Sequence, residues 1–211
     1  MSEGVTNRWR SAPLHSGTML VLALLFVFGF AFIIRPMLRD GPPGDYETRQ
    51  GDIELSAGEF AAALQRFEAA LAKSPDHRGA LMGRAIVLMQ TGREVDAEAV
   101  LDRLIDQLTT TSVADDRTGQ GALAAAYANR GILRDRSGRY AGALADYHLS
   151  LRIDRQAVAG PGLIDRILQG EPRPSTVAKR AAYLEEQLRL PAAERRMRLP
   201  DIDQRQRMYK P

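Results

Sequence analysis

Apolar residues follow two different patterns along the chain. Residues 17–34 form a single run of 18 uncharged residues, GTMLVLALLFVFGFAFII, which is apolar on every side. Further on, apolar and small residues instead recur three or four positions apart, as in AYANRGILRDRSGRYAGALADYHLSLRID (residues 126–154). The first pattern predicts a helix in apolar surroundings, and the second predicts a series of amphipathic helices interrupted at glycines.

The uncharged run has the length of a membrane span. At about 1.5 Å per residue, a helix of this run would be roughly 27 Å long, close to the thickness of the hydrocarbon core of a bilayer. A cleaved signal peptide and a buried helix are the alternatives. The run is longer than a usual signal core, however, and RPMLRD follows it rather than a small-x-small cleavage site. We therefore predict an N-terminal tail at residues 1–16, a transmembrane anchor at 17–38 and a linker at 39–45.

The orientation of the anchor depends on the charges that flank it. Arg8 and Arg10 precede the run, and Arg35, Arg39 and, further off, Arg49 follow it, so the positive-inside count is nearly tied and leans slightly against a cytoplasmic N-terminus. A short tail before a single anchor usually stays in the cytoplasm, which places the rest of the chain outside. Arginine accounts for 26 of the 29 basic residues, a bias that suggests a bacterial source. We predict a bacterial inner-membrane protein with a periplasmic soluble domain.

A glycine-centred pattern occurs three times after the anchor. Gly58 and Gly92 are 34 residues apart, and Gly138 follows 46 residues after Gly92. Five positions after each glycine there is a small residue, and four positions further there is a large apolar one: Ala63 and Phe67, Ala97 and Leu101, Ala143 and Tyr147. Glycine suits the turn between two antiparallel helices, and alanine lets the helices approach closely. The pattern predicts helical hairpins that must stack, because one hairpin cannot bury its apolar face alone.

These hairpins resemble the tetratricopeptide repeat, a unit of about 34 residues that carries W-x2-L-G-x2-Y, then A-x3-F, then P. The third copy matches best, because Tyr127 stands at the tryptophan position, Gly131 at the glycine, and Ala143 with Tyr147 forms the A-x3-F pair. The resemblance implies an all-α fold: a short solenoid of about three helical hairpins and a C-terminal capping helix, after the single transmembrane helix. The predicted repeat region is 46–157, with copies at 44–77, 78–111 and 124–157, a loop insertion at 112–123, capping helices at 158–191 and a basic extended tail at 192–211.

The capping region contains two candidate helices. A short one is expected near residues 163–168 and a longer one near 176–189, where Val177, Ala181, Leu184 and Leu188 share one face. Ser175 is the expected N-cap of the longer helix.

The resemblance also implies a binding groove, because in this family the first helix of each repeat lines the inner face of the solenoid. The implied groove residues are Arg49, Asp52, Met82, Ile86, Met89, Gln90, Asn129, Ile132, Asp135 and Arg136. Among them, Met82, Ile86 and Met89 would form an open apolar strip able to anchor a protein partner. The alternative is that these three side chains pack against the linker or the C-terminal helix.

Composition and motifs argue against several kinds of chemistry. The chain has no cysteine, which rules out disulfides and thiolate ligands. Its histidines lack the spacing of a metal site, and no phosphate-binding, hydrolase or zinc-protease motif is present. We therefore predict no enzymatic activity, no metal and no cofactor. Residues 41–191 carry a net charge of −2, which argues against a nucleic-acid partner.

The two ends of the chain are basic, with net charges of +2 over residues 1–40 and +3 over 192–211. The tail would either solubilise the protein as a disordered end or contact a partner or anionic headgroups. Its candidate contact residues are Arg195, Arg196, Arg198, Arg205, Arg207 and Tyr209.

Together these features predict a membrane-anchored scaffold or assembly factor that binds a protein partner in the groove and the lipid bilayer through residues 17–34. The alternative is a permanent accessory subunit of a membrane complex, held by its transmembrane helix and its tail. The sequence does not decide between them.

Overall fold

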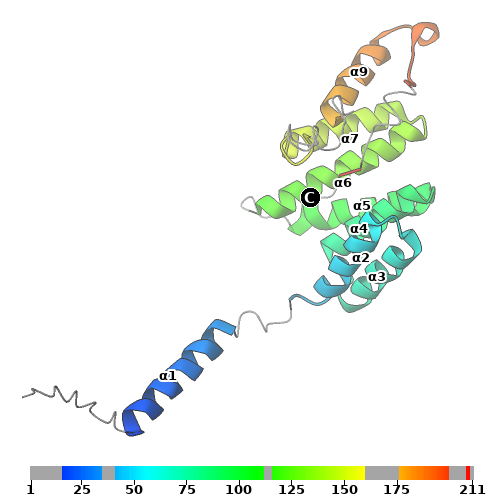
Figure 1. Cartoon of the computed structure of the whole chain (residues 1–211). Coiled ribbons are helices and arrows are strands. Elements are labelled where there is room, and N and C mark those ends of the chain that lie inside the picture. The colour runs from blue at the N-terminus through cyan, green and yellow to red at the C-terminus, as the bar shows by residue number, and fades with distance from the viewer. Residues whose placement is uncertain (1–15, 35–40, 112–115, 160–175, 200–207, 210–211) are drawn as a thin grey trace, which may run out of the picture. The chain divides into compact units, whose positions relative to one another are not determined.

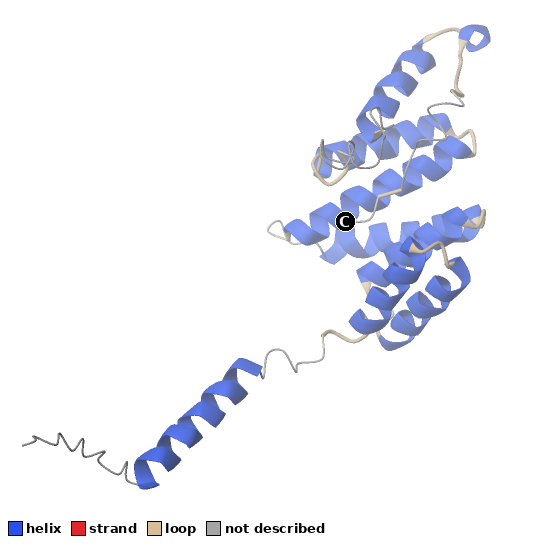
Figure 2. Cartoon of the chain, viewed as in Figure 1, coloured by secondary structure: helices blue, strands red, loops and turns tan. Residues whose placement is uncertain are grey.

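The structure, a computed structural model, describes residues 16–34, 41–111, 116–159, 176–199 and 208–209. The chain divides into two compact units, residues 1–41 and residues 42–211. Figure 2 draws the described residues as helices and loops, with no strand among them.

The first unit contains one helix, α1 (Ser16–Ile34). Side chains of α1 are described for residues 21–30, and all ten are exposed. Among the residues that the structure describes, no helix combines the length and the hydropathy needed to cross a membrane.

The second unit is built from antiparallel helical pairs (Figure 1). Its helices are α2 (Asp45–Ser56), α3 (Phe60–Lys73), α4 (Arg78–Gln90), α5 (Glu94–Thr111), α6 (Arg117–Arg136), α7 (Tyr140–Ile153) and α9 (Val177–Arg189), followed by the 3-10 helix η1 (Ala192–Glu194). The pairs α2/α3, α4/α5 and α6/α7 are the three predicted hairpins, and each packs against the next.

The turns of the three hairpins have the backbone conformation that the glycine pattern predicts. Gly58, Gly92 and Gly138 have φ angles of 80°, 74° and 79°, in the left-handed region where a side chain would be strained. In each turn, the residue after the glycine donates its N–H to a carbonyl in the last turn of the preceding helix, as Arg93 does to Leu88 (2.9 Å). The glycine therefore ends the first helix and lets the second begin within two residues.

Small residues let neighbouring helices touch, both within a hairpin and between hairpins. A Cβ placed on Gly83 would lie 2.3 Å from the ring of Phe67, and one on Gly131 would lie 2.7 Å from the ring of Tyr147. Both rings are fully buried. The aromatic residue of the A-x3-F pair thus fills the space that a glycine leaves on the neighbouring helix, which explains why both residue types recur in the pattern.

Stacking of the hairpins buries apolar side chains in two clusters, a main one that extends from α4 to α9 and a smaller one between α3 and α4 at Ala63, Phe67, Ala70, Ala80 and Val87. α3 contacts α4, α5 contacts α6 and α7 contacts α9, while the first helices α2, α4 and α6 adjoin one another in the same order. The prediction of an all-helical solenoid of tetratricopeptide-like hairpins is confirmed for the described residues. α9 packs on the last hairpin, as expected of a capping helix.

The loop predicted at residues 112–123 is wrong in part. α5 continues to Thr111, and α6 already begins at Arg117, so residues 117–123 are helical. Asp116 is the N-cap of α6: its side chain accepts a hydrogen bond from the N–H of Gly119 (2.8 Å) and pairs with Arg78 (2.9 Å). The hydrogen bond from Gly119 and the pairing with Arg78 lower the pKa of Asp116. The extra residues therefore lengthen two helices.

The capping region differs from the prediction by one residue. The N-cap of α9 is Thr176, whose hydroxyl accepts a hydrogen bond from the N–H of Lys179 (3.3 Å), and not Ser175. The short helix expected near residues 163–168 lies outside the described residues.

Candidate functional site

The apolar strip predicted on α4 is buried. Met82, Ile86 and Met89 are 2%, 6% and 5% exposed and belong to the main core cluster. The prediction of an open groove surface at these positions is therefore wrong for this structure, in which the three side chains are part of the core. The reason is the central place of α4, which contacts α2, α3, α5 and α6 and buries nine of its residues.

The other predicted groove residues of the first two repeats lie nearer the surface. Arg49 on α2 and Gln90 at the end of α4 are exposed, and Asp52 is half-buried. They leave the N-terminal part of the predicted groove open to solvent.

The predicted groove positions on α6 are covered by the C-terminal part of the chain itself. Asn129 and Ile132 are fully buried and Asp135 is 3% exposed, while Arg136 is half-buried. The covering groups come from α9, from residues 195–199 and from residues 208–209, and the last of these lie beside α6 in Figure 1.

The side chain of Asn129 binds the backbone of Tyr209 with both of its polar atoms. Nδ2 of Asn129 donates to the carbonyl oxygen of Tyr209 (2.7 Å), and the N–H of Tyr209 donates to Oδ1 of Asn129 (2.7 Å). Nδ2 also lies 3.3 Å from the sulfur of Met82. Both backbone groups of one residue can face the same amide only when that residue is extended, so this contact recognises an extended chain and not a particular side chain.

The side chain of Tyr209 makes a second kind of contact. Its hydroxyl oxygen accepts a hydrogen bond from the N–H of Val177 (3.3 Å), one of the N–H groups at the start of α9 that no carbonyl within the helix can satisfy. Burial raises the pKa of Tyr209, although the hydrogen bond from Val177 opposes the shift, so the hydroxyl is neutral at physiological pH.

A buried ion pair attaches α9 to α6. Nε and Nη2 of Arg180 donate to the two carboxylate oxygens of Asp135, each at 2.7 Å, and the hydroxyl of Tyr147 donates to Oδ2 of Asp135 (3.1 Å). Nη2 of Arg180 also donates to the carbonyl oxygen of Met197 (2.8 Å). The carboxylate of the predicted groove residue Asp135 is thus bound by the capping helix, and the same arginine binds the start of the tail.

The first half of the tail lies on the domain. Nε of Arg195 donates to the carbonyl oxygen of Leu190 (2.8 Å), and Arg198 donates to the carbonyl oxygen of Arg136. Arg196 contributes its backbone: its carbonyl oxygen accepts from the hydroxyl of Tyr183, and its N–H donates to Gln187. The predicted contact residues Arg205 and Arg207 lie outside the described residues.

A polar network that the sequence did not reveal joins the last three helices of the repeats. Asp146 on α7 is 2% exposed and accepts hydrogen bonds from Nε and Nη2 of Arg130 (3.0 and 2.7 Å) and from Nη1 of Arg134 (2.9 Å). The same arginines reach α5, where Arg130 pairs with Asp102 (2.7 Å) and Arg134 with Glu98 (2.9 Å). α5, α6 and α7 are therefore held by charge pairs as well as by apolar packing.

Hydrogen bonding sets the charge states in this network. Burial lowers the pKa of Arg130, but its hydrogen bonds to Asp146 and Asp102 outweigh burial and raise it. The hydrogen bond from Arg139 lowers the pKa of Glu98, with a smaller contribution from Arg134. Arg130 and Glu98 are therefore charged at neutral pH.

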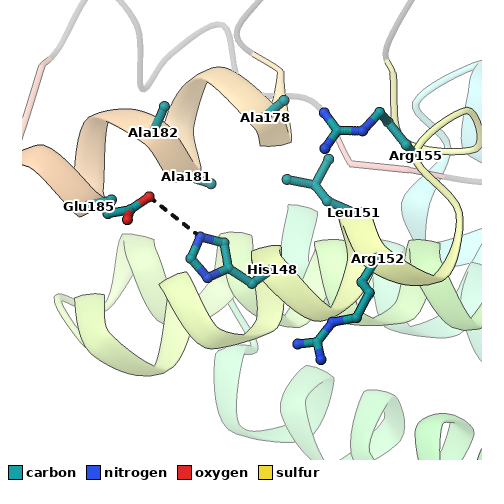
Figure 3. A pocket seen from close by; sticks show the side chains of 8 residues that line it. All are labelled: His148, Leu151, Arg152, Arg155, Ala178, Ala181, Ala182 and Glu185. Atoms are coloured by element: carbon teal, nitrogen blue, oxygen red, sulfur yellow. Dashed lines mark ion pairs between the residues drawn. The ribbon is translucent and has the colours of Figure 1, made fainter.

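A shallow pocket of about 390 Å³ lies between α7 and α9 (Figure 3). Leu151 and three alanines of α9 line it, together with the polar residues His148, Arg152, Arg155 and Glu185. In Figure 3, His148 and Glu185 face each other across it, 3.9 Å apart. Within the described ranges, no group of three or more histidine, aspartate or glutamate residues could hold a metal ion.

Comparison with known proteins agrees with the hairpin pattern. Residues 48–110 match the sequence profile of the tetratricopeptide repeat. A search of curated proteins gives no match.

Among solved structures, the chain is similar to the first tetratricopeptide repeat domain of Spaghetti (RPAP3), determined with a bound HSP90 peptide, SRMEEVD. The two are 16% identical with a TM-score of 0.46, over 62% of this chain and 94% of the other.

Proposed function

We propose that this protein is a non-enzymatic scaffold that binds an extended segment of a protein partner along α2, α4 and α6. The observation that carries the proposal is the paired hydrogen bonding between Asn129 and the backbone of an extended residue. A buried amide used in this way selects a chain conformation, which is what a groove that binds peptides requires. The match of residues 48–110 to a repeat family supports the same reading.

The competing function, an accessory subunit held by its tail, has less support. Arg196, Arg198 and Tyr209 are engaged with the chain's own helices. A tail bound in this way offers few groups to another subunit. The open residues of the predicted groove, Arg49 and Gln90, are better placed to meet a partner.

Photo-crosslinking from two exposed positions tests the proposed groove. A photoreactive amino acid at Gln90 is expected to crosslink the partner, because Gln90 is a residue of the predicted groove and is exposed. The matched control is Val95, which is 83% exposed at the start of α5. The products are compared by mass spectrometry after irradiation of intact cells. Equal yields of one partner from both positions, or none from Gln90, would contradict the proposal.

The proposal includes anchoring in a bacterial inner membrane, with the second unit in the periplasm. Its support is the run of 18 uncharged residues and the exposure of every described side chain of α1. Large apolar side chains such as Phe26 and Phe28 are favourable in lipid and unfavourable in water.

Two charges placed in α1 should release the protein from the membrane. Replacing Leu24 and Phe28 with arginine should make the free energy of membrane insertion less favourable by about 2.5–3.5 kcal/mol for each arginine near the middle of a span. The double variant is expected to appear in the supernatant after alkaline carbonate extraction, while the wild-type chain stays in the pellet. Val95→Arg adds a charge in the second unit and serves as the control. Retention of the double variant in the pellet would argue against an anchor at α1.

A further inference from the structure

We propose that the chain's own C-terminal segment, Met208–Tyr209, acts as a built-in competitor for the partner. It occupies the Asn129 slot, defined here as the surface formed by Met82, Asn129 and the N-terminus of α9 at Val177. A partner would bind this slot only by displacing the segment. This inference rests on the proposed function, since it assigns the occupant and the recognition chemistry of the same groove.

The segment is bound as a ligand would be. Asn129 and Tyr209 are 80 residues apart in sequence, and Tyr209 lies outside the helices of the repeats. The hydrogen bonds between Asn129 and Tyr209 involve only the backbone of Tyr209, which is how a receptor holds an extended peptide. The remaining contact, from the N–H of Val177 to the tyrosine hydroxyl, adds selectivity for an aromatic side chain that carries an acceptor.

The segment is held less firmly than the capping helix beside it. α9 is attached through the ion pair of Arg180 and Asp135, whose side chains are 2% and 3% exposed. Met208 and Tyr209 are only partly buried, and the described contacts of the pair with the slot are three hydrogen bonds and apolar packing. Release of the segment therefore leaves the charged core contacts of the domain intact.

Charge favours the docked state. The tail, residues 192–211, has a net charge of +3, whereas residues 41–191 have a net charge of −2. This attraction raises the local concentration of the tail at the domain, beyond the effect of the covalent link. A partner that displaces the segment should present an extended stretch with a tyrosine, preceded by an apolar residue in the place of Met208.

A peptide-binding assay tests the competition without knowledge of the partner. The probe is a fluorescently labelled peptide with the sequence of residues 200–211, titrated with the full-length chain in a mild detergent and followed by anisotropy. Tyr209→Pro opens the slot, because proline has neither the N–H that Asn129 accepts nor the hydroxyl. We expect this variant to bind the peptide at least 10-fold more tightly than the wild-type chain. A second peptide, with N-methyl-tyrosine at position 209, should lose at least 10-fold in affinity for the open variant.

The methylated peptide tests the slot without altering the protein, so misfolding cannot imitate the result. Adding Asn129→Ala to the open variant should have the same effect as methylation. Equal affinity of the wild-type and open chains would show that the segment does not compete, and would overturn this inference while the proposed groove stands. Absence of binding to both chains would show that the segment is no ligand and overturn the inference as well. The crosslinking from Gln90 still tests the partner separately.

A concentration-dependent dimer of the wild-type chain that dissociates on Tyr209→Pro would place the segment in a second copy. That outcome would also overturn competition within one chain.

Discussion

Replacing Asp135 with alanine is expected to lower the free energy of unfolding by about 3–5 kcal/mol. Asp135 and Arg180 form a two-pronged ion pair with both bonds at 2.7 Å, and neither side chain is more than 3% exposed. Without the carboxylate, the guanidinium of Arg180 would stay buried beside Tyr147 without its counter-charge. The hydroxyl of Tyr147 would also lose its acceptor.

Urea unfolding of the full-length chain, followed by circular dichroism, measures this effect. Asp96→Ala is the control. Asp96 pairs with Arg93 at the surface, so its replacement should change the free energy of unfolding very little. A combined Asp135→Leu and Arg180→Met variant should recover most of the stability that Asp135→Ala loses, because it removes both charges together. If Asp135→Ala alone changes stability no more than Asp96→Ala does, the ion pair does not hold α9 in place.

The hairpins could be predicted because their determinants are local. The turn glycines, the alanines five residues later and the rings of Phe67 and Tyr147 all act within one hairpin or on its neighbour. Their spacing in sequence therefore maps directly onto contacts in space. The length of the helices around residues 112–123 was harder to predict, because Asp116 caps a helix inside a stretch whose composition favours a loop.

The burial of α4 could also have been predicted from its residues. Leu81, Met82, Val87 and Met89 point in several directions around the helix, and a helix that is apolar on all sides is buried. The alignment of α4 with the groove positions of the tetratricopeptide repeat placed some of these residues on an open face. The distribution of apolar residues around the whole helix indicated instead that α4 lies in the core.

The occupation of the groove by the chain's own C-terminus could not be predicted from spacing. Asn129 and Tyr209 meet across 80 residues through backbone atoms, which leave no pattern in the sequence. Arg180 did leave a signal. It is a charged residue on the apolar face of α9, between Val177 and Leu184, and such a residue needs a buried partner of opposite charge.

The other large effect is expected at Asp146. Replacing it with alanine should lower the free energy of unfolding by roughly 2–3 kcal/mol. Its carboxylate accepts three hydrogen bonds from Arg130 and Arg134 and is 2% exposed. The cost should be smaller than at Asp135 because the two arginines are more exposed than Arg180 and keep other partners, Asp102 and Glu98.

A double-mutant cycle between Asp146→Ala and Arg130→Ala isolates the pair from the rest of the network. We expect a coupling free energy of about 1–3 kcal/mol in urea unfolding at neutral pH. Asp106→Ala supplies the control, since Asp106 is an exposed carboxylate on α5 and should leave stability nearly unchanged. A coupling near zero, with a large cost from Asp146→Ala alone, would mean that the residue acts by packing and that apolar contacts hold α7 on α6.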